Sequence, residues 1–269
     1  MRTKSFQLST TSFILADHIV PNVEFLSPYF DQIELLVFES QPSSVLPSKQ
    51  VVDDLLALSE KHGVIYNVHL PVDVSLSRGS AEEAKKARDT LLIVMDRFSR
   101  LNVSTHTLHL ELPDTMRSDI VDAAGVQTFR ETLENRLTPF VSCLAQPEQV
   151  SIETLDYPFE WIAPVVRDFN LRICLDIGHA LVHGHDWQSI AHTQKEKIAA
   201  VHLHGVAKTA ETIKDHTSLD RLTADHMAAI VSWLETYHGV VSIEVFNRNL
   251  LNRSLACLST YFKQIPGPL

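Results

Sequence analysis

The sequence predicts a (β/α)₈ barrel, and three observations carry this prediction. Short runs of apolar and β-branched residues recur eight times along the chain. Each run is followed by a longer segment with the residue spacing of an amphipathic helix. The chain has 269 residues, close to the roughly 250 that such a barrel needs. We therefore expect one barrel domain that spans residues 1–269.

The elements can be placed in chain order. The expected strands are residues 13–17, 33–39, 64–70, 107–112, 150–155, 171–177, 198–204 and 240–246. The clearest expected helices are residues 48–62, 80–101, 219–238 and 249–263. The second of these begins with acidic residues and carries arginine near its end, as the helix dipole favours. The longest expected loops, 72–80 and 205–215, both follow strands, on the side where barrels place their active sites.

An open, doubly wound sheet is the main alternative architecture. Its glycine-rich first turn is missing, because residues 17–21 read Asp-His-Ile-Val-Pro and no G-x-G-x-x-G motif follows the first expected strand. The sequence also lacks a linker rich in proline, glycine or serine that would divide two domains. The barrel is therefore the better prediction.

Composition excludes several classes of protein. A hydrophobic content of 45%, with 8 glycines and 12 prolines, excludes a disordered or collagen-like chain. No run approaches the roughly 18 apolar residues of a membrane span, and the first residues are polar, so we expect no membrane partner and a cytoplasmic location. Three widely spaced cysteines, Cys143, Cys174 and Cys257, are expected to be buried thiols. A net charge of −10 opposes binding to nucleic acid.

Histidine is in excess, with 14 residues, and its placement is informative. Six consecutive expected strands, the third to the eighth, end in His, Asp or Glu: His69, His109 with Glu111, Glu153, Asp176 with His179, His202 with His204, and Glu244. The carboxyl ends of barrel strands meet at one mouth. Mixed imidazole and carboxylate ligands suit Zn²⁺, Mn²⁺ or Fe²⁺. His202 and His204 share one face of a strand, so one of them can bind a metal while the other supports it.

Each of these residues also has an ordinary interpretation. A single histidine in a strand is more often hydrogen-bonded in a core than bound to a metal. Buried carboxylates such as Glu153 and Asp176 are harder to explain, because an unpaired one costs several kcal/mol. Six strand ends of the same character favour a metal site. Ordinary roles at helix ends, in loops or at the surface are expected for His62, His183, His185, His192, His226 and His238.

The sequence resembles a known protein family. Asp176-Ile177-Gly178-His179-Ala180 is similar to the D-x-x-H motif of the xylose isomerase-like TIM barrels, which include sugar isomerases, epimerases and abasic-site endonucleases. The resemblance covers nearly the whole chain and implies two or three divalent ions. Their implied ligands are Glu153, Asp176, His202 and Glu244 for one, His69, His109 and Glu153 for a second, and His179 with Asp215 or His216 for a third. Asp215 and His216 are adjacent, whereas the endonuclease branch has D-x-H there.

Within the family, residues 153–160, 174–179, 201–206 and 214–219 resemble the cobamide-remodelling phosphodiesterases. That resemblance implies a small-molecule substrate and a metal-dependent hydrolase that opens the nucleotide loop of vitamin B₁₂-type corrinoids. We expect catalysis to involve Glu153, Glu244 and His204. We expect an apolar wall for the substrate formed by Phe159, Trp161, Trp187 and Phe246.

Other functions stay open. A sugar isomerase or epimerase would use Glu153 and Glu244 to move a proton beside a single metal. An abasic-site endonuclease is opposed by the net charge and by the lack of a basic stripe. A non-enzymatic binding protein on a barrel scaffold is opposed by the full set of candidate ligands.

Overall fold

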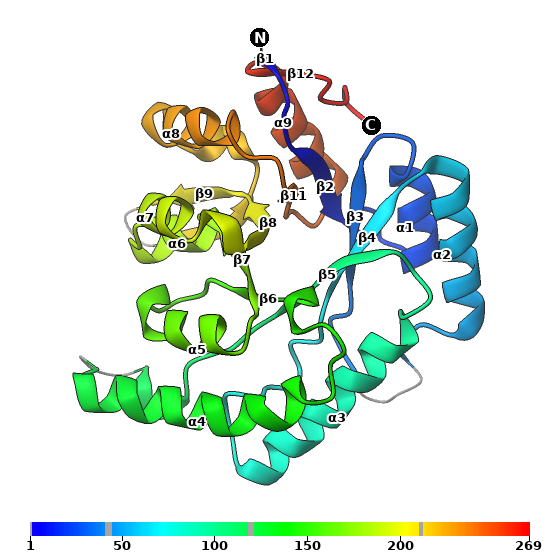
Figure 1. Ribbon diagram of the computed structural model, residues 1–269. Helices are drawn as coiled ribbons and strands as arrows, with labels where there is room; N and C mark the ends of the chain where they lie inside the picture. Colours follow the sequence, from blue (N-terminus) through cyan, green and yellow to red (C-terminus); the bar gives the residue numbers. More distant parts are fainter. Residues whose placement is uncertain (1, 41–44, 118–120, 210–211) are drawn as a thin grey trace.

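A computed structural model describes residues 2–40, 45–117, 121–209 and 212–269 of the chain. Eight parallel strands close a barrel in the order β11-β2-β3-β4-β5-β6-β7-β8, and helices surround it (Figure 1). The barrel strands are β2 (Gln7–Thr11), β3 (Gln32–Leu36), β4 (Ile65–His69), β5 (Val103–Leu108), β6 (Val150–Glu153), β7 (Arg172–Asp176), β8 (Ile198–Leu203) and β11 (Val240–Ile243). The predicted (β/α)₈ barrel is confirmed.

The helices cover the outside of the barrel in chain order (Figure 1). They are α1 (Ile19–Leu26), α2 (Lys49–His62), α3 (Ala81–Arg97), α4 (Ala123–Val141), α5 (Ala163–Asp168), α6 (Ile177–His183), α7 (Trp187–Thr193), α8 (Ala224–Leu234) and α9 (Arg248–Ser259). The start of α3 follows from its sequence: the Ser80 hydroxyl accepts from the Glu83 backbone, and the Glu83 carboxylate accepts from the Ser80 backbone.

Two expected strands are wrong in position. The first barrel strand is Gln7–Thr11, not residues 13–17, and the fourth is Val103–Leu108, not residues 107–112. Both true strands are rich in hydroxyl groups and therefore do not stand out as apolar runs. Thr10 and Thr11 are buried because their hydroxyls donate to the carbonyls of Ile243 at 2.9 Å and Val245 at 2.8 Å.

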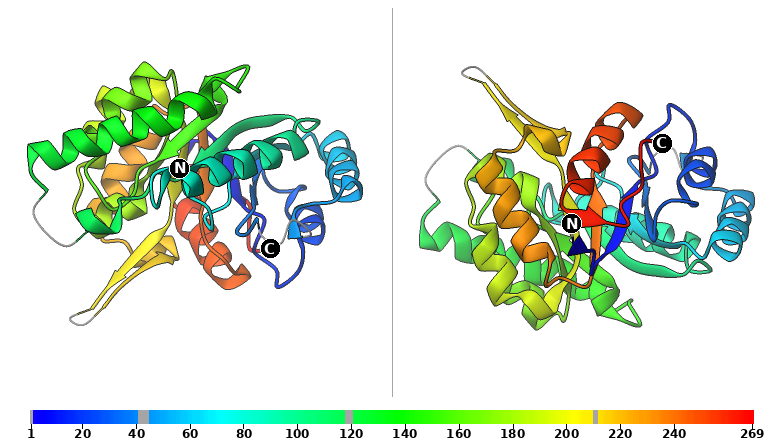
Figure 2. Two further views of the ribbon diagram at one scale, coloured as in Figure 1. Left: turned by 90° about the horizontal axis from the view of Figure 1, so that it is seen from below. Right: turned by 90° about the horizontal axis from the view of Figure 1, so that it is seen from above.

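The loop expected at residues 205–215 is also wrong. Strands β9 (Gly205–Lys208) and β10 (Ile213–Thr217) pair there as an antiparallel hairpin, which projects from the body of the molecule (Figure 2). Gly205 allows the close approach of the two strands, since a Cβ atom there would lie 2.0 Å from the Ser218 carbonyl oxygen. This hairpin brings residue 216 back to the mouth of the barrel.

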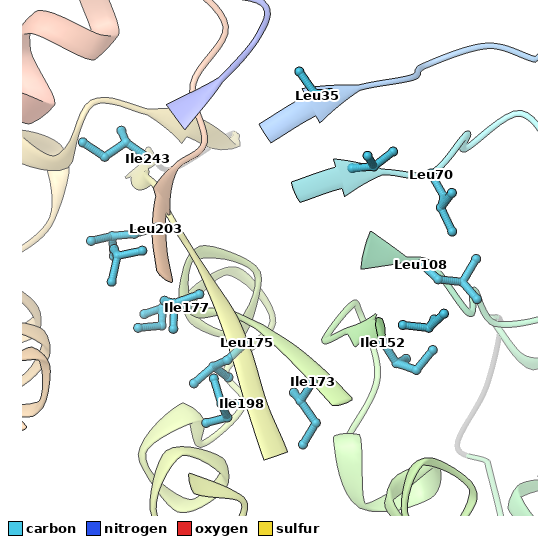
Figure 3. Packing of buried hydrophobic residues seen from close by; sticks show 14 of the residues in the cluster. Leu35, Leu70, Leu108, Ile152, Ile173, Leu175, Ile177, Ile198, Leu203 and Ile243 are labelled. Atoms are coloured by element: carbon cyan, nitrogen blue, oxygen red, sulfur yellow. The ribbon is translucent and has the colours of Figure 1, made fainter. Parts of the chain in front are cut away.

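The core fills the space between strands and helices. Leu35, Ile152, Ile173 and Ile243 are among its fully buried members, and they come from strands on different sides of the barrel (Figure 3). Outside the barrel, short strands β1 (Arg2–Thr3) and β12 (Phe262–Lys263) pair in parallel. Among the described residues, no helix is both long and apolar enough to cross a membrane.

Candidate metal centre

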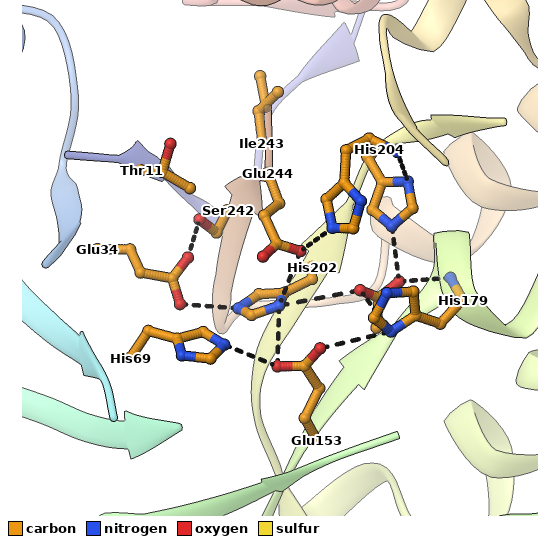
Figure 4. A network of polar contacts seen from close by, with 12 residues as sticks. Thr11, Glu34, His69, Glu153, His179, His202, His204, Ser242, Ile243 and Glu244 are labelled. Atoms are coloured by element: carbon orange, nitrogen blue, oxygen red, sulfur yellow. Dashed lines mark hydrogen bonds and ion pairs between the residues drawn. The ribbon is translucent and has the colours of Figure 1, made fainter. Parts of the chain in front are cut away.

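The polar residues predicted at strand ends meet at one end of the barrel. Glu153, Asp176 and His69 are the last residues of β6, β7 and β4. His202 lies in β8, and Glu244 directly follows β11, where its backbone N–H donates to the Leu203 carbonyl at 3.1 Å. His109 directly follows β5, so the carboxyl ends of six strands supply one cluster of side chains, drawn in part in Figure 4.

Four buried residues form what we call the first donor group: Glu153, Asp176, His202 and Glu244. The Nδ1 atom of His202 is at its centre, 3.4 Å from Glu153 Oε2, 3.2 Å from Glu244 Oε2 and 4.0 Å from Asp176 Oδ2. The four ligand atoms lie within 4.8 Å of one another. Three carboxylates so close together in a buried place repel one another unless a cation compensates them.

The second donor group is His69, His109 and Glu153. Glu153 Oε2 lies 3.3 Å from His69 Nε2 and 3.1 Å from His109 Nε2. The two imidazole rings meet edge to face, with centroids 4.8 Å apart. Glu153 belongs to both groups, because the same oxygen, Oε2, also lies 3.4 Å from His202 Nδ1.

The third donor group is Asp176, His179, His204 and His216. Asp176 Oδ1 lies 3.3 Å from His204 Nε2, and Asp176 Oδ2 lies 3.3 Å from His179 Nδ1. The backbone of His179 also donates to Asp176 Oδ1 at 2.7 Å, because Asp176 caps the N-terminus of α6. Asp176 therefore belongs to both the third and the first donor group, just as Glu153 belongs to both the second and the first.

Unpartnered atoms in these groups fit a metal centre. Five buried ligand atoms have no hydrogen-bond partner among the described residues: Asp176 Oδ2, His179 Nδ1, His202 Nδ1, His204 Nε2 and Glu244 Oε2. Buried polar atoms are normally paired, and these five all point into the clusters. Nitrogen and carboxylate ligands in this ratio suit Zn²⁺, Mn²⁺ or Fe²⁺, so the residues fit the ions that the sequence predicts.

Electrostatics in the centre couple imidazoles to carboxylates. Burial by itself lowers the pKa of His69, but its hydrogen bond to Glu153 and the neighbouring carboxylates outweigh burial and raise that pKa to about 9. Burial likewise opposes ionisation of Glu153, yet His109 and His202 hold the pKa of its carboxyl well below the usual range. Protons and metal ions therefore compete for the same atoms.

Glu34 is a site residue that the sequence prediction missed. It lies in the middle of β3, is fully buried, and accepts hydrogen bonds from His202 Nε2 at 2.8 Å, Ser242 Oγ at 2.7 Å and Asn67 Nδ2 at 3.0 Å. Most of the ligands predicted from the sequence lie at or near strand ends, whereas Glu34 does not. The available signal was a glutamate between Ile33 and Leu35 in an apolar run, which indicates a buried carboxylate that needs partners.

The structure separates Asp215 from His216. His216 belongs to the third donor group, whereas Asp215 does not; its side chain is 46% exposed and pairs with His216 at 3.2 Å. His204, expected in catalysis, lies among the candidate ligands of the third group instead. Glu111 lies outside all three groups, where it accepts hydrogen bonds from Ser75 and Ser77.

The expected aromatic wall does not form as a unit. Phe159 and Trp187 are buried in the hydrophobic core, so the structure corrects their assignment to an open surface. Trp187 packs edge to face on Trp233 with centroids 5.9 Å apart. Trp161 stacks on Tyr157. Phe246 is the member that lies beside the donor groups, with its ring stacked on that of His216 at 5.0 Å.

The cysteines differ from their expected places. Cys143 is exposed and Cys257 is half-buried, so only Cys174 is a buried thiol. Cys174 lies close enough to Glu153 and His202 to form another possible ligand cluster. Burial raises the pKa of Cys174 to about 12, so that without a metal ion its thiol stays protonated.

Comparison with known proteins identifies the family. Residues 29–261 match the family described as the xylose isomerase-like TIM barrel. The chain belongs to this family. A search of curated proteins found no match to the chain.

Solved structures of the same fold extend over almost the whole chain. A D-tagatose 3-epimerase-like protein has a TM-score of 0.75 and 18% identity, over 95% of this chain and 97% of that one. The 3-keto-D-glucoside 4-epimerase YcjR from E. coli has a TM-score of 0.70 and 12% identity, over 95% of this chain and 99% of that chain. The IolI protein with a bound zinc atom has a TM-score of 0.66 and 17% identity, over 96% of this chain and 100% of that chain. At these identities the likeness concerns the fold.

Proposed function

We propose that this member of the xylose isomerase-like TIM barrel family is a metal-dependent sugar isomerase or epimerase. The observation that carries the proposal is the first donor group, in which the Glu153 and Glu244 carboxylates approach His202 Nδ1 from β6 and β11. The two similar structures named as epimerases support it, and the zinc of the IolI structure supports a divalent ion at this mouth.

The chain's own residues can divide the work of moving a proton. Glu153, Asp176, His202 and Glu244 would hold the ion, which when bound polarises a substrate carbonyl as a Lewis acid. A substrate carbon between Glu153 and Glu244 has a carboxylate on each side, so one removes a proton and the other returns it on the opposite face. His69 and His109 donate to Glu153 and orient its carboxylate.

A second candidate is hydrolysis of a phosphodiester, and a specific observation favours it. A single-ion isomerase leaves three further histidines of the third donor group without a role: His179, His204 and His216. Phosphodiester hydrolysis at several ions requires bridging carboxylates, and Glu153 and Asp176 are each shared between two donor groups. The cobamide nucleotide loop is the phosphodiester that the sequence resemblance implies.

One experiment separates the two candidates. Metal analysis of protein loaded with Zn²⁺ or Mn²⁺ counts the ions per chain. The same samples are incubated with D-tagatose and D-fructose in D₂O, with bis-p-nitrophenyl phosphate and with an intact cobamide. One ion and deuterium incorporation next to the sugar carbonyl support the isomerase or epimerase. Two or three ions and phosphodiester cleavage support the hydrolase, and no reaction on any substrate contradicts both.

His109→Ala adds a matched test, because His109 belongs to the second donor group alone. A single-ion isomerase should keep its ion and lose no more than about tenfold in kcat, since the histidine only orients Glu153. A hydrolase that uses a bridged pair of ions should lose one ion and at least about a hundredfold in kcat. Glu153→Gln, which alters both groups, is the inactive reference.

A further inference from the structure

Four residues from different parts of the chain form one continuous stack beside the third donor group. The His204 ring lies against the backbone of Gly178, where an added Cβ atom would be 2.1 Å from His204 Cε1. The His216 ring stacks on the other face of His204, with centroids 4.2 Å apart and planes at 16°. Phe246 covers the outer face of His216, with centroids 5.0 Å apart and planes at 28°. His204 and His216 are thus held on both faces.

His216 needs such support because its backbone is unusual. Its φ is 46°, in the left-handed region that a residue with a side chain rarely adopts. The pairing of β9 and β10 is irregular between Lys214 and Thr217, so the hairpin ladder does not hold this residue in place. The His216 N–H instead lies 3.0 Å from His204 Nδ1, an atom that is also 3.2 Å from the Gly205 carbonyl, while His204 Nε2 faces Asp176.

Phe246 is itself held by neighbours at the mouth. Its ring meets Phe13 and Phe38 edge on, with centroids 6.5 and 6.2 Å away. The backbone beside it is fixed, because the Val245 carbonyl accepts from the Thr11 hydroxyl at 2.8 Å. The Phe246 ring is therefore packed against Phe13 and Phe38 as well as against His216.

We propose that Phe246 is a positioning residue that holds His216 in the third donor group, so that Asp176, His179, His204 and His216 form a preorganised site for a third divalent ion. The assignment makes His204 and His216, not Asp215, the ligands from this side of the mouth. The proposal rests on metal binding at the mouth, as the proposed function does, and a third ion there would favour phosphodiester hydrolysis over the single-ion isomerase.

The test is the number and affinity of bound ions. Metal-free protein is titrated with Co²⁺ and Zn²⁺ in buffers of defined free metal, and bound metal and the visible Co²⁺ spectrum are recorded. We expect Phe246→Leu to lower the affinity for one ion by about 10- to 100-fold, which is the range found when a group supporting a ligand is removed. The affinities for the other ions should stay unchanged. Phe246→Met, similar in volume and without a flat face, should act alike, whereas Phe246→Trp should restore affinity.

Three further variants give the experiment its controls. His216→Ala should lose the same ion as Phe246→Leu. Trp161→Leu removes an aromatic side chain that stacks on Tyr157, away from the donor groups, and should bind as the wild type does. His202→Asn tests the first donor group separately. If this variant binds as many ions as the wild type, the proposed function is contradicted, whatever the result for Phe246.

Two outcomes overturn the proposal. One is that Phe246→Leu and Phe246→Met, folded by circular dichroism, bind every ion as tightly as the wild type. The other is that the wild type binds no more ions than His216→Ala at saturating metal.

Discussion

Glu34 accepts a hydrogen bond from Nε2 of His202 at 2.8 Å. This contact determines which ring nitrogen of His202 carries a proton and which one faces the first donor group. An ionised carboxylate can only accept, so Nε2 of His202 carries the proton. The opposite ring atom, Nδ1, faces Glu153 and Glu244 and would offer its lone pair to a bound ion in place of a proton. A carboxylate behind a histidine ligand in this way fixes the tautomer and increases its basicity.

The first prediction concerns Glu34. Glu34→Gln removes the negative charge behind His202, so we expect the affinity of the first donor group for Zn²⁺ to fall about 10- to 100-fold. Competition with a fluorescent chelator measures this affinity. Ser242→Ala, which removes one of the other hydrogen bonds to Glu34, should have a smaller effect. Unchanged affinity in Glu34→Gln would show that His202 is not a ligand.

The second prediction concerns removal of metal. Folding places the carboxylates of Glu153, Asp176 and Glu244 together, and a bound ion compensates them only in the native state. Zn²⁺ at 100 times its Kd should therefore stabilise the protein by about 2.7 kcal/mol, which raises Tm by roughly 5–10 °C for a chain of this size. Thermal unfolding with EDTA and with buffered Zn²⁺ measures the shift. The shift should be smaller in His202→Asn, and an equal shift in that variant would show that the stabilising ion is bound outside the first donor group.

How much of the fold the sequence predicted depends on what each strand buries. Strands such as β7 (Arg172–Asp176) and β8 (Ile198–Leu203) are mostly apolar and were found within about two residues. Strands β2 and β5 bury threonine and serine hydroxyls instead, for example Thr10 and Thr105, and are stable because these groups donate to buried partners. Hydropathy cannot show such partners, since they come from strands distant in the sequence.

The candidate site was predicted where one strand end identified one residue, as for His69, Glu153 and Asp176. Site residues were missed where their place depends on contacts between parts of the chain that are distant in the sequence. Glu34 lies in mid-strand, and only barrel closure brings it to His202. The choice between Asp215 and His216 depends on a left-handed residue in an irregular hairpin, which spacing along the chain does not reveal.

The third prediction concerns Gly178 in α6. Alanine usually stabilises a helix relative to glycine by up to about 1 kcal/mol. Here the new Cβ would lie 2.1 Å from the His204 ring, so overpacking should prevail and destabilise the protein by about 1–3 kcal/mol. Urea unfolding of metal-free protein measures the sign. Gly267→Ala, where a Cβ meets nothing within 4 Å, is the control, and a more stable Gly178→Ala would show that His204 moves freely.

The last prediction is the pH dependence of stability that His106 contributes. His106 lies in β5, with Nδ1 3.4 Å from the Gln149 carbonyl and Nε2 buried without a partner among the described residues. Burial lowers the pKa of His106 to about 4, from 6.5 when exposed. The unfolded chain therefore takes up a proton between pH 6.5 and 4 that the folded chain does not, and stability is lost as the pH falls through this window.

The loss from this residue alone is at most about 3 kcal/mol, at 1.36 kcal/mol for each unit of pKa difference. His106→Gln cannot take up the proton, so its free energy of unfolding should fall less than that of the wild type between pH 7 and pH 5. Urea unfolding of metal-free protein at both values measures the difference. His226→Gln, at an exposed position, should follow the wild type. If His106→Gln also follows the wild type, the imidazole is protonated in the folded protein and its burial is not what limits stability in acid.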